Sequence, residues 1–283
     1  MPPRFHRPGH AFFAGAPQLI AHRGGAGLAP ENTMAAFRQA IEEWDADILE
    51  MDVRATADGR VVVIHDETVD RTTDGTGRVS EMSWARAREL DAGFRFADPA
   101  GEASFRGCGV RLPLFEEVLD AFPDMRIVVE PKAAEAAAPL VREIRAAGAE
   151  DRVLVGAEFE ATRVGARGYR GPWGASRRQV APFWFLHHIG LAGRWFAPAA
   201  DGFQLPERSG RLRVVTPRLL RAARAANMPV YVWTVNDTED MRRLLRWGAD
   251  GIMTDRPDLL AAVLSEVAGR PPPPGAGHNG RPS

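Results

Sequence analysis

Cysteine is nearly absent from this sequence of 283 residues, in which Cys108 is the only one. A single cysteine excludes a disulfide within the chain and fits a reducing compartment. No spacing of Cys and His residues matches a zinc site either. The sequence therefore favours neither a disulfide-stabilised fold nor a zinc centre.

Long apolar runs are absent as well. The longest, Ala181–Pro198, is interrupted by two histidines and an arginine and is shorter than the roughly 20 residues that a membrane-spanning helix needs. Near the start, the apolar piece Ala11–Ala16 is too short for the core of a secretory signal. We expect no transmembrane segment and a cytoplasmic location.

Neither sign of charge is in excess. The 36 Lys and Arg residues nearly balance the 37 Asp and Glu residues, which leaves a formal net charge of −1. This balance gives no overall field that would gather nucleic acid or an anionic membrane. We expect a small-molecule partner and no nucleic acid, and the oligomeric state stays open.

The length is typical of one domain with one large core, as in single-domain α/β barrels. We expect residues 1–16 to form a loose N-terminal arm and residues 17–268 to form the folded domain. The remaining segment, 269–283, reads GRPPPPGAGHNGRPS. Its many Pro and Gly residues leave little to bury, which predicts a disordered tail.

Short β-branched runs alternate with helical patterns along the folded domain, and this alternation favours parallel strands joined by crossover helices. Strands are expected at Gln18–His22, Asp47–Asp52, Val61–His65, Arg126–Glu130, Arg152–Gly156, Trp173–Ser176, Gly202–Leu205, Pro229–Thr234 and Gly251–Thr254. Helices are expected at Thr33–Trp44, Leu114–Phe122, Ala134–Ala147, Thr216–Asn227, Asp237–Trp247 and Pro257–Val267.

One gap between strands is too short for a helix. The eight residues from Val53 to Arg60 cannot make a parallel crossover, and Asp58-Gly59 is a hairpin signal. Val61–His65 should therefore run antiparallel beside Asp47–Asp52 as a β-hairpin after the second strand. The other eight strands are the number that closes a TIM (β/α)8 barrel.

Polar residues gather where the predicted strands end, which in such barrels is the face that carries the chemistry. Glu50 and Asp52 are two residues apart, as are Glu130 and Lys132, so each pair points to one face of its strand. Three converging carboxylates need a cation between them, and all-oxygen ligation suits Mg²⁺ or Ca²⁺.

Two histidines and two cationic side chains complete this constellation. His22 ends the first strand, and the hairpin brings His65 near Asp52, so two imidazoles beside a cation could serve as acid and base. Arg23 and Lys132 would hold an anion such as phosphate. The combination predicts a site that cleaves a phosphodiester.

Several linked motifs carry a resemblance to a known family. The strings HRGGAGLAPENTMAAF, LEMDVRATADGRVVVIHDETVDRTTDGTGRV, VEPK, VWTVN and GIMTDRP occur in this order from about Gln18 to Asp258. In order and spacing they resemble the glycerophosphodiester phosphodiesterase family of TIM-barrel enzymes. The resemblance implies a TIM barrel with a small family-specific insertion, here about residues 67–111.

The same resemblance assigns roles to the candidate residues. It implies one divalent cation on Glu50, Asp52 and Glu130, and catalytic imidazoles at His22 and His65. It places Arg23 and Lys132 against phosphate and Trp233 at the glycerol end of the pocket. The implied reaction is hydrolysis of glycerophosphodiesters to sn-glycerol 3-phosphate and an alcohol through a cyclic phosphate, with the acid and base roles of the two histidines unassigned.

One position departs from the family pattern. Pro131 stands where the family usually has an aliphatic residue, and proline cannot donate to a strand ladder. The inward direction of Lys132 is therefore less well defined by the sequence than that of Glu130.

The sequence leaves alternatives open at two segments and for the activity itself. The aromatic segment Ala181–Pro198 is interpreted first as the sixth barrel helix, with its apolar side on the core. If its aromatic residues instead line the site, they could receive an acyl chain, and the enzyme would be a lysophospholipase D or a lyase that stops at the cyclic phosphate. A non-catalytic phosphate-binding barrel is the third hypothesis.

Glu31 and Asn32 are interpreted mainly as a helix start, with contact to the site as the alternative.

Overall fold

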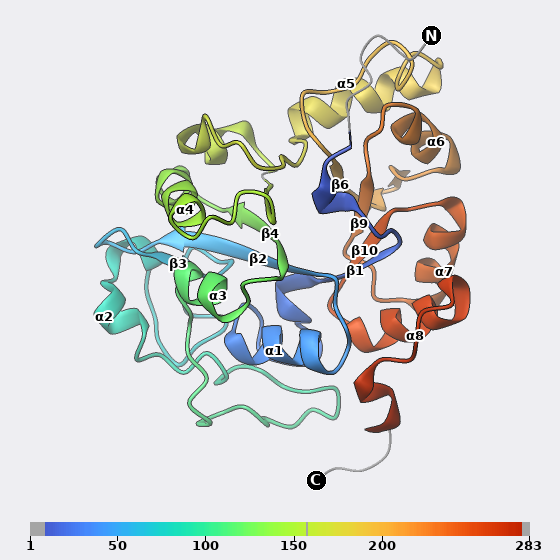
Figure 1. Cartoon of the computed structure of the whole chain (residues 1–283). Coiled ribbons are helices and arrows are strands. Elements are labelled where there is room, and N and C mark those ends of the chain that lie inside the picture. Colours follow the sequence, from blue (N-terminus) through green and yellow to red (C-terminus); the bar gives the residue numbers. More distant parts are fainter. Residues whose placement is uncertain (1–8, 157, 279–283) are drawn as a thin grey trace.

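The computed structural model describes residues 9–156 and 158–278 and shows parallel strands surrounded by helices (Figure 1). The strands are β1 (Gln18–Ala21), β2 (Ile48–Ala55), β3 (Val61–Val63), β4 (Arg126–Pro131), β5 (Val153–Val155), β6 (Phe203–Pro206), β7 (Arg208–Ser209), β8 (Leu212–Arg213), β9 (Val230–Trp233) and β10 (Gly251–Thr254). The α-helices are α1 (Met34–Glu42), α2 (Trp84–Ala87), α3 (Phe115–Ala121), α4 (Ala134–Ala146), α5 (Arg177–His188), α6 (Pro217–Ala225), α7 (Thr238–Trp247) and α8 (Pro257–Ala268).

The parallel sheet has the order β5-β4-β2-β1-β10-β9-β6. Its two ends are joined through Trp173 and Gly174, which form parallel bridges to Val155 on one side and Gly202 on the other. This closure confirms the predicted TIM barrel, although the expected strand Trp173–Ser176 is reduced to those bridges. A Cβ at Gly174 would lie 2.6 Å from Gln204 Oε1 and 3.2 Å from the Gly156 Cα, so the chain passes close to both neighbours at this position.

The predicted hairpin is present, because β3 pairs antiparallel with β2 in the register Val53 to Val63. Gly59 in its turn has φ +77°, a conformation that glycine adopts without strain. After the hairpin the chain leaves the barrel, and residues 67–111 form loops around the short helix α2 with a small apolar cluster of their own. The hairpin thus carries the chain from the barrel to this insertion.

A buried plug fills one end of the barrel. Phe12 and Phe13, in the short 3-10 helix η1 (Ala11–Phe13), pack with interior residues such as Ile20 and Tyr231. Residues 9–16, part of the segment expected to be a loose arm, are therefore held in place by burial of two aromatic rings. Residues 1–8 of that arm lie outside the described part of the chain.

The six helices predicted from periodicity occur with shifts of one or two residues at their ends. The helix expected over Ala181–Pro198 differs more, because α5 begins four residues earlier and ends ten residues sooner, at His188. The Thr33 hydroxyl caps α1 by accepting a hydrogen bond from the Ala36 N–H, and Thr216 does the same for α6. A helix that the pattern did not predict is the 3-10 helix η4 (Glu160–Ala166), which packs on α4.

Part of the segment expected to be a disordered tail also has a defined position. Arg270 makes an ion pair of 2.5 Å with Asp47, and the Gly275 N–H donates to the Glu43 carbonyl. Residues 274–278 form the 3-10 helix η5 (Pro274–His278), whereas 279–283 lie outside the described residues. Over the ranges that are described, no helix is long and apolar enough to cross a membrane.

Candidate active site

A cavity of about 650 Å³ lies at the carboxyl ends of the barrel strands. Every one of the candidate residues lines it, namely His22, Arg23, Glu50, Asp52, His65, Glu130, Lys132 and Trp233. They come from β2, β4 and β9, from the 3-10 helix η2 (His22–Gly24) that follows β1, and from the loops after β3 and β4. The barrel therefore brings side chains that are more than 200 residues apart in sequence to a single mouth.

Three carboxylates form the floor of this mouth. Glu50 and Asp52 project from the same side of β2 and are buried, and Glu130 is the register partner of Asp52 on β4. Burial, together with the neighbouring charge of Asp52, raises the pKa of Glu50 to about 7. Such a raised pKa indicates that these acids lack enough positive charge for all of them to ionise at low cost.

Lys132 supplies part of that charge. Its Nζ lies 3.0 Å from Asp52 Oδ1 and 3.0 Å from Glu130 Oε2. The Lys132 N–H donates to the Val53 carbonyl, so the strand pairing with β2 resumes directly after Pro131 and turns the side chain into the cavity. Lys132 is also the only lysine in the sequence.

Arg23 contacts the carboxylates of the site through both its main chain and its side chain. It occupies the left-handed region with φ +51°, and its N–H donates to Glu50 Oε2 at 2.9 Å. Its guanidinium lies 3.2 Å from Asp52 and donates to Glu31 at 2.9 Å. A non-glycine residue held at positive φ has a strained backbone, which is common where function fixes the geometry.

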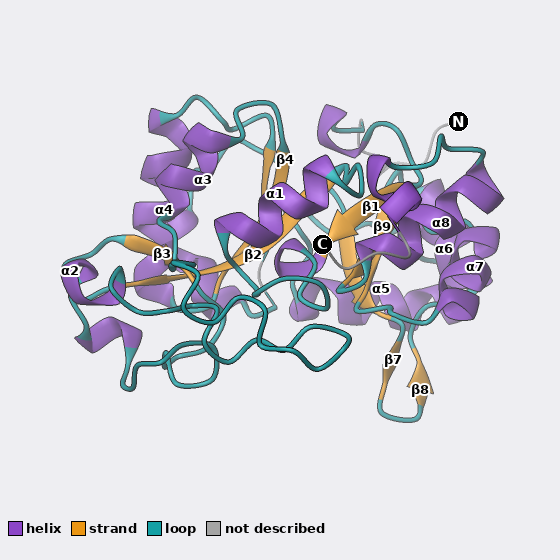
Figure 2. Cartoon of the chain, turned by 90° about the horizontal axis from the view of Figure 1, so that it is seen from below, coloured by secondary structure: helices purple, strands orange, loops and turns teal. Residues whose placement is uncertain are grey.

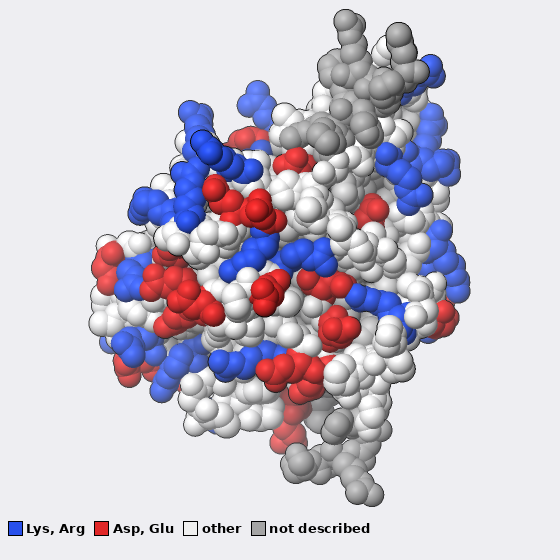
Figure 3. Space-filling view, in the orientation of Figure 1, with Lys and Arg blue, Asp and Glu red and all other residues white. Residues whose placement is uncertain are grey.

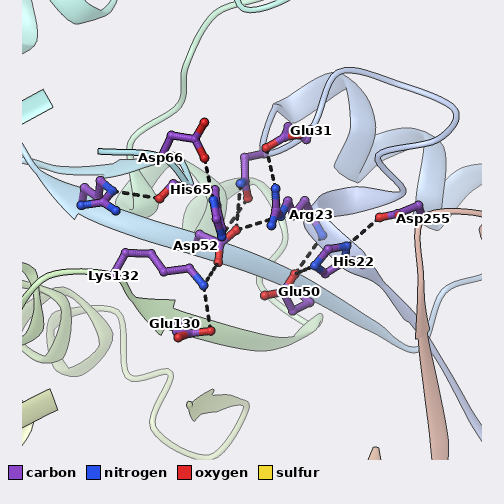
Figure 4. Close-up of polar contacts among 12 residues, drawn as sticks. His22, Arg23, Glu31, Glu50, Asp52, His65, Asp66, Glu130, Lys132 and Asp255 are labelled. Carbon is purple, nitrogen blue, oxygen red and sulfur yellow. Dashed lines mark hydrogen bonds and ion pairs between the residues drawn. The ribbon is translucent and has the colours of Figure 1, made fainter. Parts of the chain in front are cut away.

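His22 is oriented by a carboxylate. Its Nδ1 lies 2.6 Å from Asp255 Oδ1 (Figure 4). Asn236 donates to the other oxygen of Asp255. Burial opposes protonation of this imidazole, but the hydrogen bond with Asp255 and the charge of Glu50 outweigh it, so the pKa of His22 lies above its ordinary value. The Nε2 side of the ring faces Glu50 at 3.9 Å.

His65 has a matching arrangement. Its Nδ1 lies 2.7 Å from Asp66 Oδ1, and its carbonyl accepts a hydrogen bond from Arg54. Arg71 binds Asp66 at 2.6 Å and Glu31 at 2.7 Å, and its hydrogen bonds hold the pKa of Asp66 well below the usual range. Because Glu31 also binds Arg23, a continuous chain of charged contacts links His65 to Arg23.

The other end of the cavity is apolar. Val180, Trp184 and Phe185 of α5 line it together with Leu212 of β8 and Val214, which follows β8. The aromatic segment therefore both packs on the core and lines the cavity. Phe183 is buried against Phe203 in the core, whereas its neighbours Trp184 and Phe185 border the cavity.

Three side chains that support the site were given no role on sequence grounds: Asp66, Arg71 and Asp255. Asp255 lies in the motif GIMTDRP and Asp66 follows His65 directly, so position alone could have suggested both. Arg71 belongs to the insertion, and no local pattern indicates its contacts. Asn32 donates to Asp52 and accepts from its N–H, which supports the alternative of contact to the site, while Thr33 is the helix cap.

The three carboxylates are also the candidate ligands of a metal ion. As the side chains stand, no group of three or more His, Cys, Asp or Glu residues in the described ranges is arranged to hold an ion. Lys132 bridges two of the acids and Arg23 contacts one of them. Even so, the buried carboxylates of Glu50 and Asp52, with the half-buried carboxylate of Glu130 beside them, are oxygen donors of the kind that a hard divalent cation requires.

Comparison with known proteins gives a consistent result. Residues 22–259 match the model of the "Glycerophosphoryl diester phosphodiesterase family". The chain is 33% identical over 259 residues to the glycerophosphodiester phosphodiesterase of Caldanaerobacter subterraneus subsp. tengcongensis, covering 87% of this chain and 97% of that protein.

Solved structures show the same fold. The glycerophosphodiester phosphodiesterase of Agrobacterium tumefaciens has a TM-score of 0.69 and 28% identity, with 87% of this chain and 99% of that chain covered. An Oleispira antarctica phosphodiesterase, solved with its product sn-glycerol-3-phosphate, has a TM-score of 0.70 and 23% identity over 90% of this chain and 99% of its own.

Proposed function

We propose, from the premise that the chain belongs to the glycerophosphoryl diester phosphodiesterase family, that it hydrolyses glycerophosphodiesters to sn-glycerol 3-phosphate and an alcohol. The observation that carries this proposal is the pair of imidazoles in one cavity. His22 and His65 each bind a carboxylate through Nδ1, and both line the cavity that also contains the three carboxylates and the two cationic side chains (Figure 4).

The two histidines would move the protons. With Nδ1 engaged by an Asp, Nε2 of each ring is the atom left to act on substrate. One imidazole takes the proton of the glycerol 2-hydroxyl as its oxygen attacks phosphorus. The other gives a proton to the departing alcohol as the phosphorus–oxygen bond breaks, and water then opens the resulting cyclic phosphate. Which histidine takes which role is left unassigned.

Arg23 and Lys132 would hold the phosphate, because both reach the cavity with cationic groups. Glu50, Asp52 and Glu130 would hold one divalent cation, Mg²⁺ or Ca²⁺. When bound, this cation supplies positive charge that stabilises the negative charge developing on the phosphoryl oxygens. The three acids would then pair with the cation. The Lys132 ammonium, no longer needed to pair with Asp52 and Glu130, would be available to bind the substrate phosphate. Trp233, half-buried where β9 ends, would border the glycerol moiety.

The direct test is product analysis with glycerophosphocholine as substrate. We expect choline and sn-glycerol 3-phosphate in equal amounts, measured by a coupled assay for glycerol 3-phosphate and by phosphorus NMR. Accumulation of the cyclic phosphate as the final product would indicate a lyase instead. Phosphate binding with no product of either kind would identify a non-catalytic barrel.

A second candidate, lysophospholipase D activity, is favoured by the apolar end of the cavity. Trp184 and Phe185 border this end and could contact an acyl chain. Burying a side chain of this size contributes about 2 kcal/mol, so losing both contacts should matter only for a substrate that has the chain.

We therefore expect Trp184→Ala/Phe185→Ala to lower kcat/KM for lysophosphatidylcholine by about tenfold or more. With glycerophosphocholine, which has no acyl chain, the same variant should keep kcat/KM within about threefold of wild type. Equal kcat/KM values of variant and wild type on lysophosphatidylcholine would remove the acyl-chain assignment.

A further inference from the structure

The near-zero net charge conceals a strong local excess of positive charge. Residues 177–221, from α5 to α6, contain eight arginines and only two acidic residues, whereas the whole chain has a net charge of −1. All eight arginines are exposed. On the face shown in Figure 3, the upper right edge over α6 is correspondingly blue with little red. Segment 177–221 thus has a net charge of +6, and the rest of the chain has a net charge of −7.

Large apolar side chains are exposed in the same region. Phe185 on α5 is 67% exposed and Leu212 on the β7–β8 hairpin is 50% exposed, and both also line the apolar end of the cavity. Figure 2 shows that the hairpin projects away from the body of the protein. We define the docking rim by the exposed residues here, which are Arg177, Arg178, Phe185, Arg208, Arg211, Leu212 and Arg213.

Two carboxylates face this rim and reduce its charge only in part. Glu158 makes an ion pair of 2.9 Å with Arg177. Glu207 lies 3.8 Å from Arg208 and 3.9 Å from Arg213, but its closer partner is Arg243 at 2.9 Å. The hairpin arginines therefore extend beyond their acidic neighbours into solvent.

We propose that the docking rim binds the surface of an anionic lipid layer. Exposed Phe and Leu side chains among arginines are the composition of an interfacial contact, in which the apolar groups enter the acyl region and the guanidinium groups meet headgroup phosphates. Charge complementarity selects an anionic layer. A soluble polyanion would use the arginines but would gain nothing from Phe185 and Leu212, which is why a lipid surface accounts for the whole rim.

This proposal goes beyond the proposed hydrolysis and adds a location for it. The rim borders the apolar end of the cavity, so a lipid layer bound there would lie next to the entrance of the site. Binding to vesicles is measured without turnover. If the protein failed to bind vesicles, the proposed hydrolysis would still stand. If it failed to hydrolyse the substrate, the proposed lipid binding would still stand.

The test is co-sedimentation of the full chain with vesicles of phosphatidylcholine containing about 30% phosphatidylglycerol at low salt. The charge variant is Arg178→Gln/Arg211→Gln/Arg213→Gln, whose positions do not line the cavity. An arginine near such a surface favours binding about fivefold, so the variant should lose at least about tenfold in partition coefficient. High salt should weaken wild-type binding in the same direction.

The matched control removes three exposed arginines elsewhere, Arg38→Gln/Arg86→Gln/Arg88→Gln, on α1 and around α2. It should bind vesicles like wild type, and both triple variants should hydrolyse glycerophosphocholine normally. Equal partition coefficients of the two triple variants, or equal binding of wild type to pure phosphatidylcholine, would overturn the proposal. So would Phe185→Ala/Leu212→Ala with undiminished vesicle binding, which would instead indicate a site for a soluble polyanion.

Discussion

His22→Ala is expected to lower kcat for glycerophosphocholine by about a thousandfold, within the range that a positioned acid or base contributes. The imidazole is fixed by Asp255 at 2.6 Å and directed toward the carboxylates at the mouth of the cavity. Its removal takes away one proton transfer and leaves phosphate binding largely in place. The loss should therefore fall on kcat rather than on KM.

The fold should survive this substitution, because Asp255 keeps its hydrogen bonds with Asn236 and remains partly exposed. Thermal unfolding of the variant would verify this. His188→Ala is a suitable control, since His188 is exposed and does not line the cavity. A His22→Ala enzyme that retains kcat within a few fold of wild type, measured by release of glycerol 3-phosphate, would contradict the assigned role.

Removal of divalent cations is expected to have an effect of similar size. Dialysis against a chelator should lower activity more than about a hundredfold, and Mg²⁺ or Ca²⁺, added separately, should restore it and show which ion serves. The physical reason is the crowding of negative charge at Glu50 and Asp52. Because the pKa of Glu50 is raised to about 7, its ionisation destabilises the folded state increasingly as pH rises from about 4.5 to 7, and a bound cation relieves that cost.

Thermal denaturation gives a readout that does not need turnover. At saturating cation the melting temperature of the chelator-treated wild type should rise, since a ligand at about 100 times its Kd stabilises the folded state by about 2.7 kcal/mol. Asp52→Asn should show a smaller rise because one carboxylate charge is missing. Undiminished turnover in the chelator would refute the cation assignment.

Much of the barrel could be predicted because its signals are local. Asp58-Gly59 indicated the hairpin, and the hairpin in turn indicated that His65 lies near Asp52; the structure places both on the same cavity. The two-residue spacing of Glu50 and Asp52 likewise defined their common face. These inferences needed only strand alternation and chain connectivity.

Other features depend on contacts that no local pattern contains. Phe12 and Phe13 look like a short apolar piece in a Pro-rich segment, and only the closed barrel creates the space that they fill. Arg71 reaches Glu31 across 40 residues. The total charge of −1 argued against attraction to a membrane, but a total averages over the surface and cannot show that eight arginines are concentrated between 177 and 221.

The solitary lysine has a practical consequence for anyone handling this protein. Amine-directed reagents have one side-chain target in the sequence, Lys132, and that target stands in the mouth of the cavity between Asp52 and Glu130. Fluorescent labelling or surface immobilisation through amines would thus modify the candidate active site whenever it modifies a side chain at all. The exposed thiol of Cys108 lies in the insertion and not among the residues that line the cavity, so it offers the safer point of attachment.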